Sequence, residues 1–574
     1  MRTHLLKIMG AVLAPAVFAA VLATASISDR TIFDVVIEGG RIVDGTGAPW
    51  YRGDIGIVGD RIQAIGNLKS VSASRRIDAR GLVVAPGFID MLGQSEFNLL
   101  VDNRAASKIL QGVTSEITGE LASIAPLNER QLAEGGVVYG RFAEFGVEPD
   151  FRTLDGYFKR LEERTHPAIN LGTFIGSGGV RDYVIGKANR PATPSEMEQM
   201  KDLVAQGMQE GALGVSSSLQ YVPSIFSSTD ELVELAKVAA SYGGIYATHQ
   251  RSEGDRVFES LDEVFAIVDR AKIPAEIWHL KAAYKQNWGK MREILKRIQA
   301  ARSRGLDISA NMYPYSASMN ALDSSLPPWI REGGIEEMLV RLHDRTQRDR
   351  AKTDMQQPAT TWENQYYGCG GGDGIMLISV SNPTLRRYEG MTLAEIGKQQ
   401  GKDPRDVLMD VVIADRGMSR AVNLMMDEAD VQLALKDPLV SIGTDSGAKA
   451  EDGPLAPSKS HPRAWGSFPR VLGHYVRDEH LLTLEEAIRK MTSQPAARVH
   501  LNDRGILRPG MTADITIFES EKIRDIASYR DPNRYSVGVK YVMVNGRVVV
   551  DEGKITSERP GRVLRGPGYR GTNE

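Results

Sequence analysis

Three residues that can bind a metal or move a proton each follow an apolar run of the sequence. His249 ends the run GGIYATH, His279 ends PAEIWH and Asp445 ends PLVSIGTD. Such runs are typical of buried strands. If these strands are parallel, their carboxyl ends meet at one face, where two imidazoles and a carboxylate can hold a catalytic zinc and leave a position for water. The pattern therefore predicts a catalytic metal site.

The sequence around these residues alternates short apolar runs with amphipathic helical stretches. One such helix is marked by a capping box of Ser228 with Glu231 and by a stop at Gly243. Regular alternation of strand and helix predicts a parallel sheet. Over residues 86–504 we expect an α/β fold, a metal-dependent (β/α)8 TIM-like barrel, with a doubly wound sheet as the alternative. The alternative is disfavoured because no GxGxxG opens a helix after the first strand.

Both ends of the chain have a different texture, with short Val and Ile runs separated by Gly-Gly, Asp-Gly and Asn-Gly pairs. Asn545-Gly546 predicts a tight hairpin turn. We expect residues 31–85 and 505–565 to form one small β-sandwich domain. From about 320 to 372 the barrel pattern gives way to polar, helical sequence, and an insertion at this position predicts a lid over the active site.

Composition narrows the class of partner. The 574 residues carry a formal net charge of −3 with a pI of about 6.4, so no basic field favours nucleic acid, and a small-molecule substrate is expected. Residues 1–25 combine a basic start, an apolar run and Ala23-Thr24-Ala25, which predicts a signal peptide; an uncleaved anchor is the alternative. We expect an exported protein, periplasmic or secreted, with no membrane attachment after cleavage. Cys369 is the single cysteine, so no disulfide is expected within the chain.

Several long motifs together carry a family resemblance. They are GALGVSSSLQYVPSIF, IYATHQRSEGD, EIWHLKAA, NMYPYSAS, IGTDSGA, HPRAWGSFPRVLGHY and RGILRPGMTADITIF. In these segments the chain resembles the N-acyl-D-amino-acid deacylases (D-aminoacylases) of the amidohydrolase superfamily, from about Phe33 to Arg565. The resemblance implies a metal-binding barrel with a small β-sandwich from both termini, and a hydrolase acting on C–N bonds other than peptide bonds.

The resemblance also implies a metal set, with two departures from the family pattern. His249 and His279 match metal ligands. Relatives carry His-x-His after the first barrel strand, where this chain has Leu92 and Gln94. Leu92 cannot bind a metal and Gln94 binds one only weakly, so a second metal site is doubtful. Many deacylases have a ligand cysteine near the end of the next strand, where this chain offers Glu120, a competent hard ligand. We expect one Zn²⁺ per chain.

The remaining site residues follow from the same match. Asp445 is implied as a carboxylate at the metal that takes the proton from the attacking water and delivers it to the departing amine. Arg463 and Lys281 match positions that bind the free carboxylate of a small-molecule substrate. The pocket tyrosines implied are Tyr221 and Tyr313, with Tyr315 as the alternative for the second.

The resulting hypothesis is an exported metal-dependent amidohydrolase of N-acyl amino acids, of D configuration, or of small peptide-like amides. One alternative keeps the metal but takes cyclic amides or dipeptides of unusual linkage as substrates. Another is a ligand-binding protein that has lost catalysis together with the His-x-His metal site. The orientation of Arg463 and Lys281 discriminates between the first two, because a cyclic amide has no free α-carboxylate to bind.

Overall fold

The computed structural model describes residues 32–571 except 121, 360 and 458, and at 136–138 it describes the backbone alone. The predicted signal peptide, residues 1–25, lies outside the described residues. Within the described part of the chain, no helix combines the length and the apolarity that crossing a bilayer requires.

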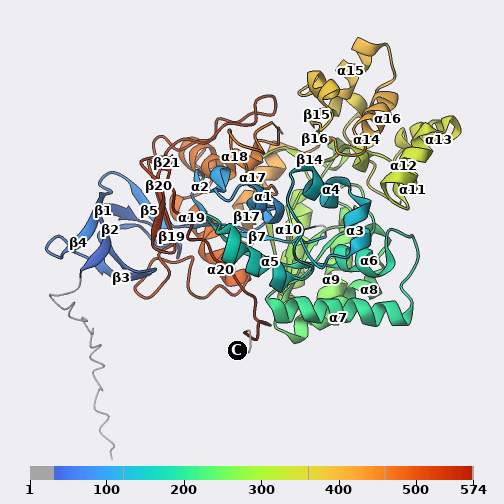
Figure 1. Ribbon diagram of the computed structural model, residues 1–574. Coiled ribbons are helices and arrows are strands. Elements are labelled where there is room, and N and C mark those ends of the chain that lie inside the picture. The colour runs from blue at the N-terminus through green and yellow to red at the C-terminus, as the bar shows by residue number, and fades with distance from the viewer. Residues whose placement is uncertain (1–31, 121, 360, 458, 572–574) are drawn as a thin grey trace, which may run out of the picture.

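A closed barrel of eight parallel strands forms the centre of the molecule (Figure 1). Neighbouring strands pair in parallel, and a bridge between Gly93 and Ser446 brings the last strand against the first. The α/β barrel expected from the alternation is thus confirmed. Its strands are β6 (Phe88–Asp90), β7 (Val113–Thr118), β8 (Asn170–Thr173) continued by β9 (Ile175–Gly176), β10 (Gly214–Ser218), β11 (Ile245–His249), β12 (Ala275–Ile277), β13 (Ile308–Met312) and β17 (Val440–Ile442).

Helices cover the outside of the barrel and bury their apolar faces against its strands. The predicted capping residue Ser228 accepts the backbone N–H of Glu231 at 3.2 Å, and Gly243 adopts φ 77° just after the helix. These helices are α5 (Leu154–Arg160), α6 (Ser177–Ile185), α7 (Pro194–Glu210), α8 (Thr229–Ser241), α9 (Val257–Ala271), α10 (Met291–Ser303), α17 (Glu428–Lys436), α18 (Arg463–Arg470), α19 (Leu484–Met491) and α20 (Ser493–Arg498). Four further helices follow the first two strands: α1 (Glu96–Val101), α2 (Ala106–Ile109), α3 (Glu129–Glu134) and α4 (Gly136–Glu144).

The two ends of the chain meet in one hydrogen-bonded sheet of nine strands. The join is the antiparallel pairing of β5 with β18. Asn545 and Gly546 have φ of 46° and 78°, the left-handed backbone that a type I′ hairpin turn requires. The strands are β1 (Phe33–Ile42), β2 (Tyr51–Val58), β3 (Arg61–Gly66), β4 (Ala73–Asp78), β5 (Val83–Pro86), β18 (Ile515–Phe518), β19 (Val539–Val544), β20 (Arg547–Asp551) and β21 (Lys554–Ile555).

Between β13 and β17 the chain leaves the barrel and builds an insertion with its own apolar core. Its three strands pair antiparallel in the order β14, β16, β15. Because β14 pairs with β16, the insertion spans 317–424 and is longer than the predicted 320–372. Its elements are β14 (Ala317–Ala321), α11 (Pro328–Arg331), α12 (Ile335–His343), α13 (Arg345–Met355), α14 (Gln365–Gly368), β15 (Ile375–Ser379), α15 (Leu393–Gln400), α16 (Pro404–Ala414) and β16 (Arg420–Leu424).

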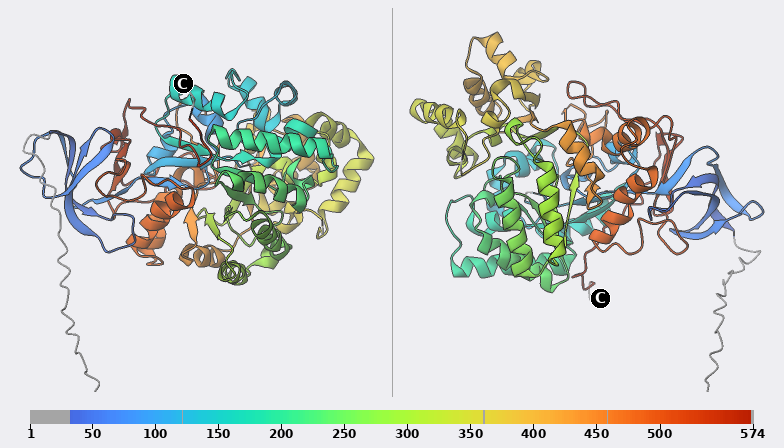
Figure 2. Two further views of the ribbon diagram at one scale, coloured as in Figure 1. Left: turned by 90° about the horizontal axis from the view of Figure 1, so that it is seen from below. Right: turned by 180° about the vertical axis from the view of Figure 1, so that it is seen from behind.

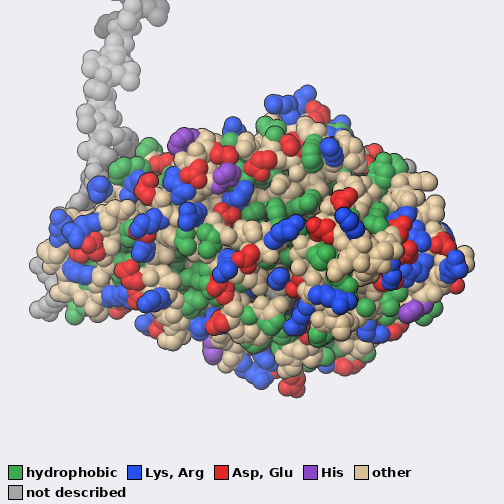
Figure 3. Space-filling model, turned by 90° about the horizontal axis from the view of Figure 1, so that it is seen from above, with side chains coloured by type: hydrophobic (Ala, Val, Ile, Leu, Met, Phe, Trp, Pro, Cys, Tyr) green, Lys and Arg blue, Asp and Glu red, His purple; other side chains and the backbone are tan. Residues whose placement is uncertain are grey.

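The nine-stranded sheet and the insertion lie at opposite ends of the barrel (Figures 1 and 2). The C-terminal segment leaves the sheet and returns to the barrel at Leu171. There the backbone N–H of Leu171 donates to the carbonyl of Arg562 at 3.0 Å, and the carbonyl of Leu171 accepts the backbone N–H of Leu564 at 2.8 Å. This return ties the sheet end of the molecule to β8. On the face seen in Figure 3, acidic and basic side chains are interspersed, in keeping with the small net charge.

Candidate metal centre and active site

Glu120, His249 and His279 converge at the carboxyl ends of three barrel strands. Glu120 follows β7 by two residues, His249 is the last residue of β11, and His279 follows β12 by two. The Glu120 Oε1 atom lies 3.1 Å from His249 Nδ1 and 3.0 Å from His279 Nε2. Parallel strands bring their carboxyl ends to one face of the barrel, so residues far apart in the sequence meet there.

The three side chains fit a single zinc ion. One ligand atom from each lies within 4.8 Å of the other two. A tetrahedral zinc with nitrogen and oxygen ligands at about 2.0–2.2 Å needs ligand atoms roughly 3.3–3.6 Å apart, a spacing that small side-chain movements reach from here. Burial opposes ionisation of Glu120, but hydrogen bonds from both imidazoles hold its pKa well below the usual range. The donor set is therefore a carboxylate with two imidazoles, as a catalytic zinc prefers.

Two predicted site residues have a backbone conformation that side chains rarely adopt. His279 has φ 36° and Asp445 has φ 48°. A non-glycine residue in this region costs on the order of 1–3 kcal/mol and persists where surrounding structure enforces it. Here the backbone N–H of His279 donates to Asn311 Oδ1 at 2.9 Å, and that of Asp445 donates to the Leu92 carbonyl at 2.7 Å. These bonds hold both side chains towards the barrel mouth.

Glu253 is a site residue that the sequence reasoning missed. Its Oε1 atom lies 2.9 Å from His279 Nδ1 and 2.6 Å from Lys281 Nζ. If His279 binds zinc through Nε2, its Nδ1 carries the hydrogen and donates to Glu253, which fixes the ring orientation and tautomer. Lys281 Nζ also lies 2.8 Å from Nδ1, but an ammonium and an N–H cannot bond to each other, so both donate to the carboxylate.

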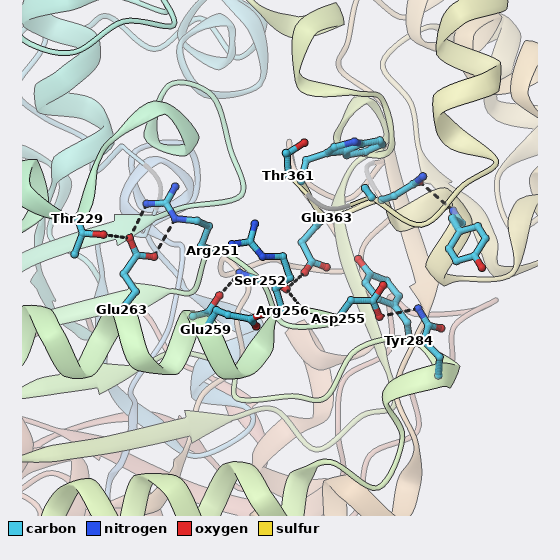
Figure 4. Close-up of a pocket in the computed structure, with 16 residues that line it drawn as sticks. Thr229, Arg251, Ser252, Asp255, Arg256, Glu259, Glu263, Tyr284, Thr361 and Glu363 are labelled. Carbon is cyan, nitrogen blue, oxygen red and sulfur yellow. Dashed lines mark hydrogen bonds and ion pairs between the residues drawn. The ribbon is translucent and has the colours of Figure 1, made fainter.

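The loop that carries Glu253 is clamped from its far side, as Figure 4 shows. Glu363 of the insertion accepts the Ser252 hydroxyl, and Arg251 makes two bonds of 2.9 Å to Glu263. A cavity of about 260 Å³ lies among these side chains. None of Glu120, His249 and His279 lines it, so it is separate from the metal centre and lies behind the loop that supports it.

On the opposite side of the barrel mouth, Leu92 and Gln94 stand where relatives carry His-x-His. Leu92 is fully buried and packs in an apolar cluster with Trp278. Gln94 Nε2 donates to Glu120 Oε2 at 2.6 Å and to Asp445 Oδ1 at 2.9 Å. The amide nitrogen must face these carboxylates, because its oxygen would repel them. Gln94 thus joins the two carboxylates with hydrogen bonds.

A buried charge network supports this side from below. Lys108 Nζ contacts Asp90 Oδ2 at 2.6 Å and Glu116 Oε1 at 3.3 Å. Glu116 Oε1 also accepts the backbone N–H of Ser95 at 3.1 Å. At Gly93 an added Cβ would meet Glu116 Oε1 at 1.8 Å, so only glycine allows this carboxylate to pass beneath the segment. The space beside Leu92 and Gln94 is filled by the chain's own ion pairs.

Asp445, expected both at the metal and as the base, lies at the same barrel mouth as the three potential ligands. It lies outside the group of three potential ligands. Its Oδ1 is held by Gln94 and its Oδ2 lies 2.6 Å from Arg463 Nη1. Burial raises the pKa of Asp445 to about 6, against the attraction of Arg463. A carboxylate with this pKa is ionised at neutral pH and still basic enough to accept a proton.

The two cations expected to bind a substrate carboxylate each have an internal carboxylate partner. Lys281 pairs with Glu253, and Arg463 pairs with Asp445. The Arg463 guanidinium stacks on Tyr313, 4.5 Å from its ring centre. The Arg463 contact is short but poorly aligned, and Arg463 Nε and Nη1 and the Tyr313 hydroxyl make no aligned hydrogen bond to any described residue. Nη1 is occupied by the Asp445 contact, which leaves Arg463 Nε and the Tyr313 hydroxyl as buried donors for an oxygen ligand.

A cavity of about 570 Å³ lies between the barrel mouth and the insertion, and Arg463 is the one predicted site residue that is not on its wall. The predicted residues on its wall are Glu120, Tyr221, His249, His279, Lys281, Tyr313 and Asp445. Tyr221 lies against His249, with ring centres 5.1 Å apart. Tyr315, the alternative to Tyr313, instead donates its hydroxyl to Asp525 at 3.0 Å, behind the cavity wall. Arg463 reaches the site from behind Tyr313 and Asp445.

Comparison with known proteins places this site in a family. The model of the amidohydrolase family matches residues 75–550. The D-aminoacylase of Alcaligenes xylosoxydans xylosoxydans is 35% identical over 94% of this chain and 98% of its own length. The N-acyl-D-glutamate deacylase of the same organism is 34% identical over 93% and 96%.

Solved structures agree with this placement. The zinc complex of the N-acyl-D-glutamate deacylase of Bordetella bronchiseptica with a phosphonate inhibitor superposes with a TM-score of 0.77, at 30% identity over 93% of this chain and 100% of that one. A D-aminoacylase studied for its binuclear metal centre superposes with a TM-score of 0.75 at 32% identity, with the same coverage. The chain belongs to the amidohydrolase family, within its N-acyl-D-amino-acid deacylase (D-aminoacylase) group of hydrolases that act on C–N bonds other than peptide bonds.

Proposed function

We propose that this chain hydrolyses the amide bond of N-acyl amino acids of D configuration, with one zinc ion per chain. The observation that carries the proposal is the convergence of Glu120, His249 and His279 beside the Asp445 carboxylate in one cavity. When bound there, zinc would supply a Lewis acid that polarises the scissile carbonyl and makes water a stronger acid. The names of the relatives, D-aminoacylase and N-acyl-D-glutamate deacylase, support the substrate class.

The chain's own residues perform the proton transfers. Asp445 accepts the proton of the attacking water at a carboxylate oxygen and then gives it to the departing amine nitrogen. Gln94 and Arg463 hold one oxygen each, which fixes the direction in which the carboxylate faces. Because both partners are hydrogen-bond donors, they stabilise the ionised form that the first step requires.

The substrate is oriented by buried hydrogen-bond donors of Arg463 and Tyr313, which lie beside Asp445. Arg463 Nη1 faces Asp445, but Arg463 Nε and the Tyr313 hydroxyl are buried without a hydrogen-bond partner in the described residues, and an α-carboxylate can accept both. Lys281 and Tyr221 line the same cavity and shape it from the histidine side. A carboxylate held at Arg463 would set which face of the amide meets the water, and thus the stereochemical preference.

A single zinc is supported by the contacts of Gln94. Its amide group occupies the position between Glu120 and Asp445 where a second cation would neutralise both. One solved D-aminoacylase is described in terms of one-metal activation and second-metal attenuation, which supports the sufficiency of one ion in this family.

The test is a substrate panel with zinc-loaded full-length protein. We expect hydrolysis of N-acetyl-D-amino acids, a slower or absent reaction with the L enantiomers, and none with hydantoins, which lack a free α-carboxylate. Arg463→Ala should lower kcat/KM for carboxylate substrates far more than for the corresponding N-acyl amino amides. Zinc-loaded protein that hydrolyses no member of the panel would reject the proposal, and hydrolysis of hydantoins alone would favour a cyclic-amide hydrolase.

We further propose that the protein is exported. The basic residues Arg2 and Lys7, the apolar run and the small residues at 23–25 support a cleaved signal peptide. Mass determination of the protein from the periplasm or medium of an expressing bacterium should give a chain starting at Ser26. An intact N-terminus in the cytoplasmic fraction would contradict export.

A further inference from the structure

Three arginines from separate elements line the cavity on the side formed by the insertion and α4. Arg141 lies in α4, Arg331 ends α11 and Arg420 begins β16. We call this set the guanidinium wall. Lys449, in the segment after β17, lines the same cavity beside them. The wall therefore combines charges from the barrel mouth and from the insertion.

The guanidinium wall is not neutralised by the chain. None of its three arginines makes an ion pair within 4.0 Å among the residues that the structure describes. Arg331 is only 8% exposed, and its Nε has no hydrogen-bond partner in that part of the chain. By contrast Arg181, which is fully buried, contacts Glu231 at 2.6 Å. Buried charges are normally paired, so the wall lacks the partner that a purely structural arginine has.

The contacts that these arginines make within the chain do not neutralise their positive charge. Arg141 donates to the side-chain oxygen of Asn98 at 2.7 Å and stacks on Phe97, 4.3 Å from the ring centre. Neither partner is anionic. Asp323 attracts Arg331 and Arg420 but forms no ion pair with either in the described residues. A guanidinium bound by neutral groups can still accept a carboxylate in its fork of donors.

Electrostatics of the cavity point the same way. Burial lowers the pKa of Arg141 to about 9 and that of Lys449 to about 7; repulsion by Arg420 adds to both shifts, and attraction by Glu144 opposes them. Burial likewise lowers the pKa of Arg331 and Arg420. Because guanidinium stays protonated at neutral pH, the cost of burying these charges is one that an anion bound at the wall would relieve.

We propose that the guanidinium wall binds a second carboxylate of the substrate, apart from the α-carboxylate assigned to Arg463. This inference rests on the proposed function, because it names the class of N-acyl amino acid that the cavity takes. The second carboxylate can come from an acidic amino-acid side chain or from a dicarboxylic acyl group. Both present the same planar anion to the wall, and they are separated by experiment.

The experiment compares acidic substrates with neutral ones of equal shape. N-acetyl-D-glutamate is paired with N-acetyl-D-glutamine, and N-succinyl-D-alanine with N-butanoyl-D-alanine. For wild-type zinc enzyme we expect the acidic member of at least one pair to have a kcat/KM higher by roughly 10- to 100-fold, the range of a charged hydrogen bond. The pair that shows the preference identifies the source of the carboxylate.

Substitution then tests the wall itself. In Arg331→Gln and Arg420→Gln the acidic-to-neutral ratio should fall towards one, and the ratio is insensitive to a general loss of folded enzyme. The matched control is Arg387→Gln, an exposed arginine of the insertion outside the cavity lining, which should keep the wild-type ratio. A ratio near one for both pairs in wild type, or an unchanged ratio in both wall variants, would overturn the inference.

Calorimetric binding separates this inference from the proposed function. If no pair is hydrolysed, tighter binding of an acidic member to wild type than to Arg420→Gln would still support the wall while the proposed reaction fails. Equal binding within both pairs, or no binding at all, would overturn the wall. Hydrolysis of neutral N-acyl-D-amino acids without any acidic preference would leave the proposed function standing alone.

Discussion

The two sides of the barrel mouth differ in how they balance negative charge. On one side Glu120 faces two imidazoles, His249 and His279, whose nitrogens converge on one of its oxygens. On the other side Gln94 donates an amide N–H₂ to the carboxylates of Glu120 and Asp445. The first arrangement offers three potential ligand atoms to a cation, whereas in the second an amide links the two carboxylates and Arg463 pairs with one of them.

The difference lies in the partners that the chain itself gives to its buried carboxylates. A buried carboxylate without a partner is costly. On the side of Gln94 the chain meets this cost with the Gln94 amide above and the Lys108 ion pairs below. Asp445 thus has a hydrogen-bond donor and an ion-pair partner within the chain.

The largest expected effect comes from the ligand side. Glu120→Ala and His249→Ala each remove one of three ligands, so bound zinc should fall from about one per chain to near zero. Activity should fall by roughly 10³-fold or more, since the Lewis acid is lost. Elemental analysis of the purified variants measures this directly. Zinc retained at one per chain in Glu120→Ala would mean that the ion sits elsewhere, and two zinc ions in wild type would contradict the role given to Gln94.

Asp445→Asn tests the boundary between the two sides. The structure places this carboxylate outside the ligand group, so the variant should keep its zinc while kcat/KM falls by about 10²- to 10⁴-fold through loss of the base. Zinc content and turnover are measured on the same preparation. Loss of the metal together with activity would show that Asp445 is a ligand as well as a base.

The sequence was sufficient to predict the residues placed by local pattern. His249, His279 and Asp445 each follow a strand, and a strand with its turn is readable from alternating apolar residues and glycine. In a barrel, that local position alone brings them to one face. The eight-stranded barrel and the pairing of both termini in one sheet follow from the same periodicity.

Other features depended on contacts that no local pattern reports. Glu253 follows His249 by four residues in a loop, and only the fold brings it against His279 and Lys281. A carboxylate this close to a ligand histidine was an available signal. The length of the insertion was missed because its last strand, β16, pairs with β14 across a long stretch of helices. The contacts of Gln94 with Glu120 and Asp445 also depend on the fold, because the sequence does not show which groups an amide faces.

Glu253→Gln tests whether this carboxylate supports zinc binding by orienting His279. Glutamine keeps the shape but removes the charge that orients His279 and balances Lys281. Loss of such a supporting partner typically lowers metal affinity or activity about 10- to 100-fold. Zinc affinity from a competition titration is the measurement. Glu259→Gln, at the neighbouring cavity of Figure 4, is the matched control and should bind zinc as wild type does. Equal zinc affinities of wild type and both variants would show that Glu253 does not contribute to metal binding.

The smallest effect is expected from Gln94→Leu in metal-free protein, and it depends on pH. Without the amide, the Glu120 and Asp445 carboxylates lose a shared donor, which should lower the free energy of unfolding by about 1–3 kcal/mol. The folded-state pKa of Asp445, already raised by burial to about 6, would rise further above its unfolded value, so protonation favours the folded state. The loss should therefore be larger at pH 8 than at pH 5. Denaturant unfolding in the presence of a chelator measures the loss of unfolding free energy at each pH, with Gln432→Leu as the control. Equal losses at pH 8 and pH 5 would show that Gln94 acts through packing and not through the carboxylates.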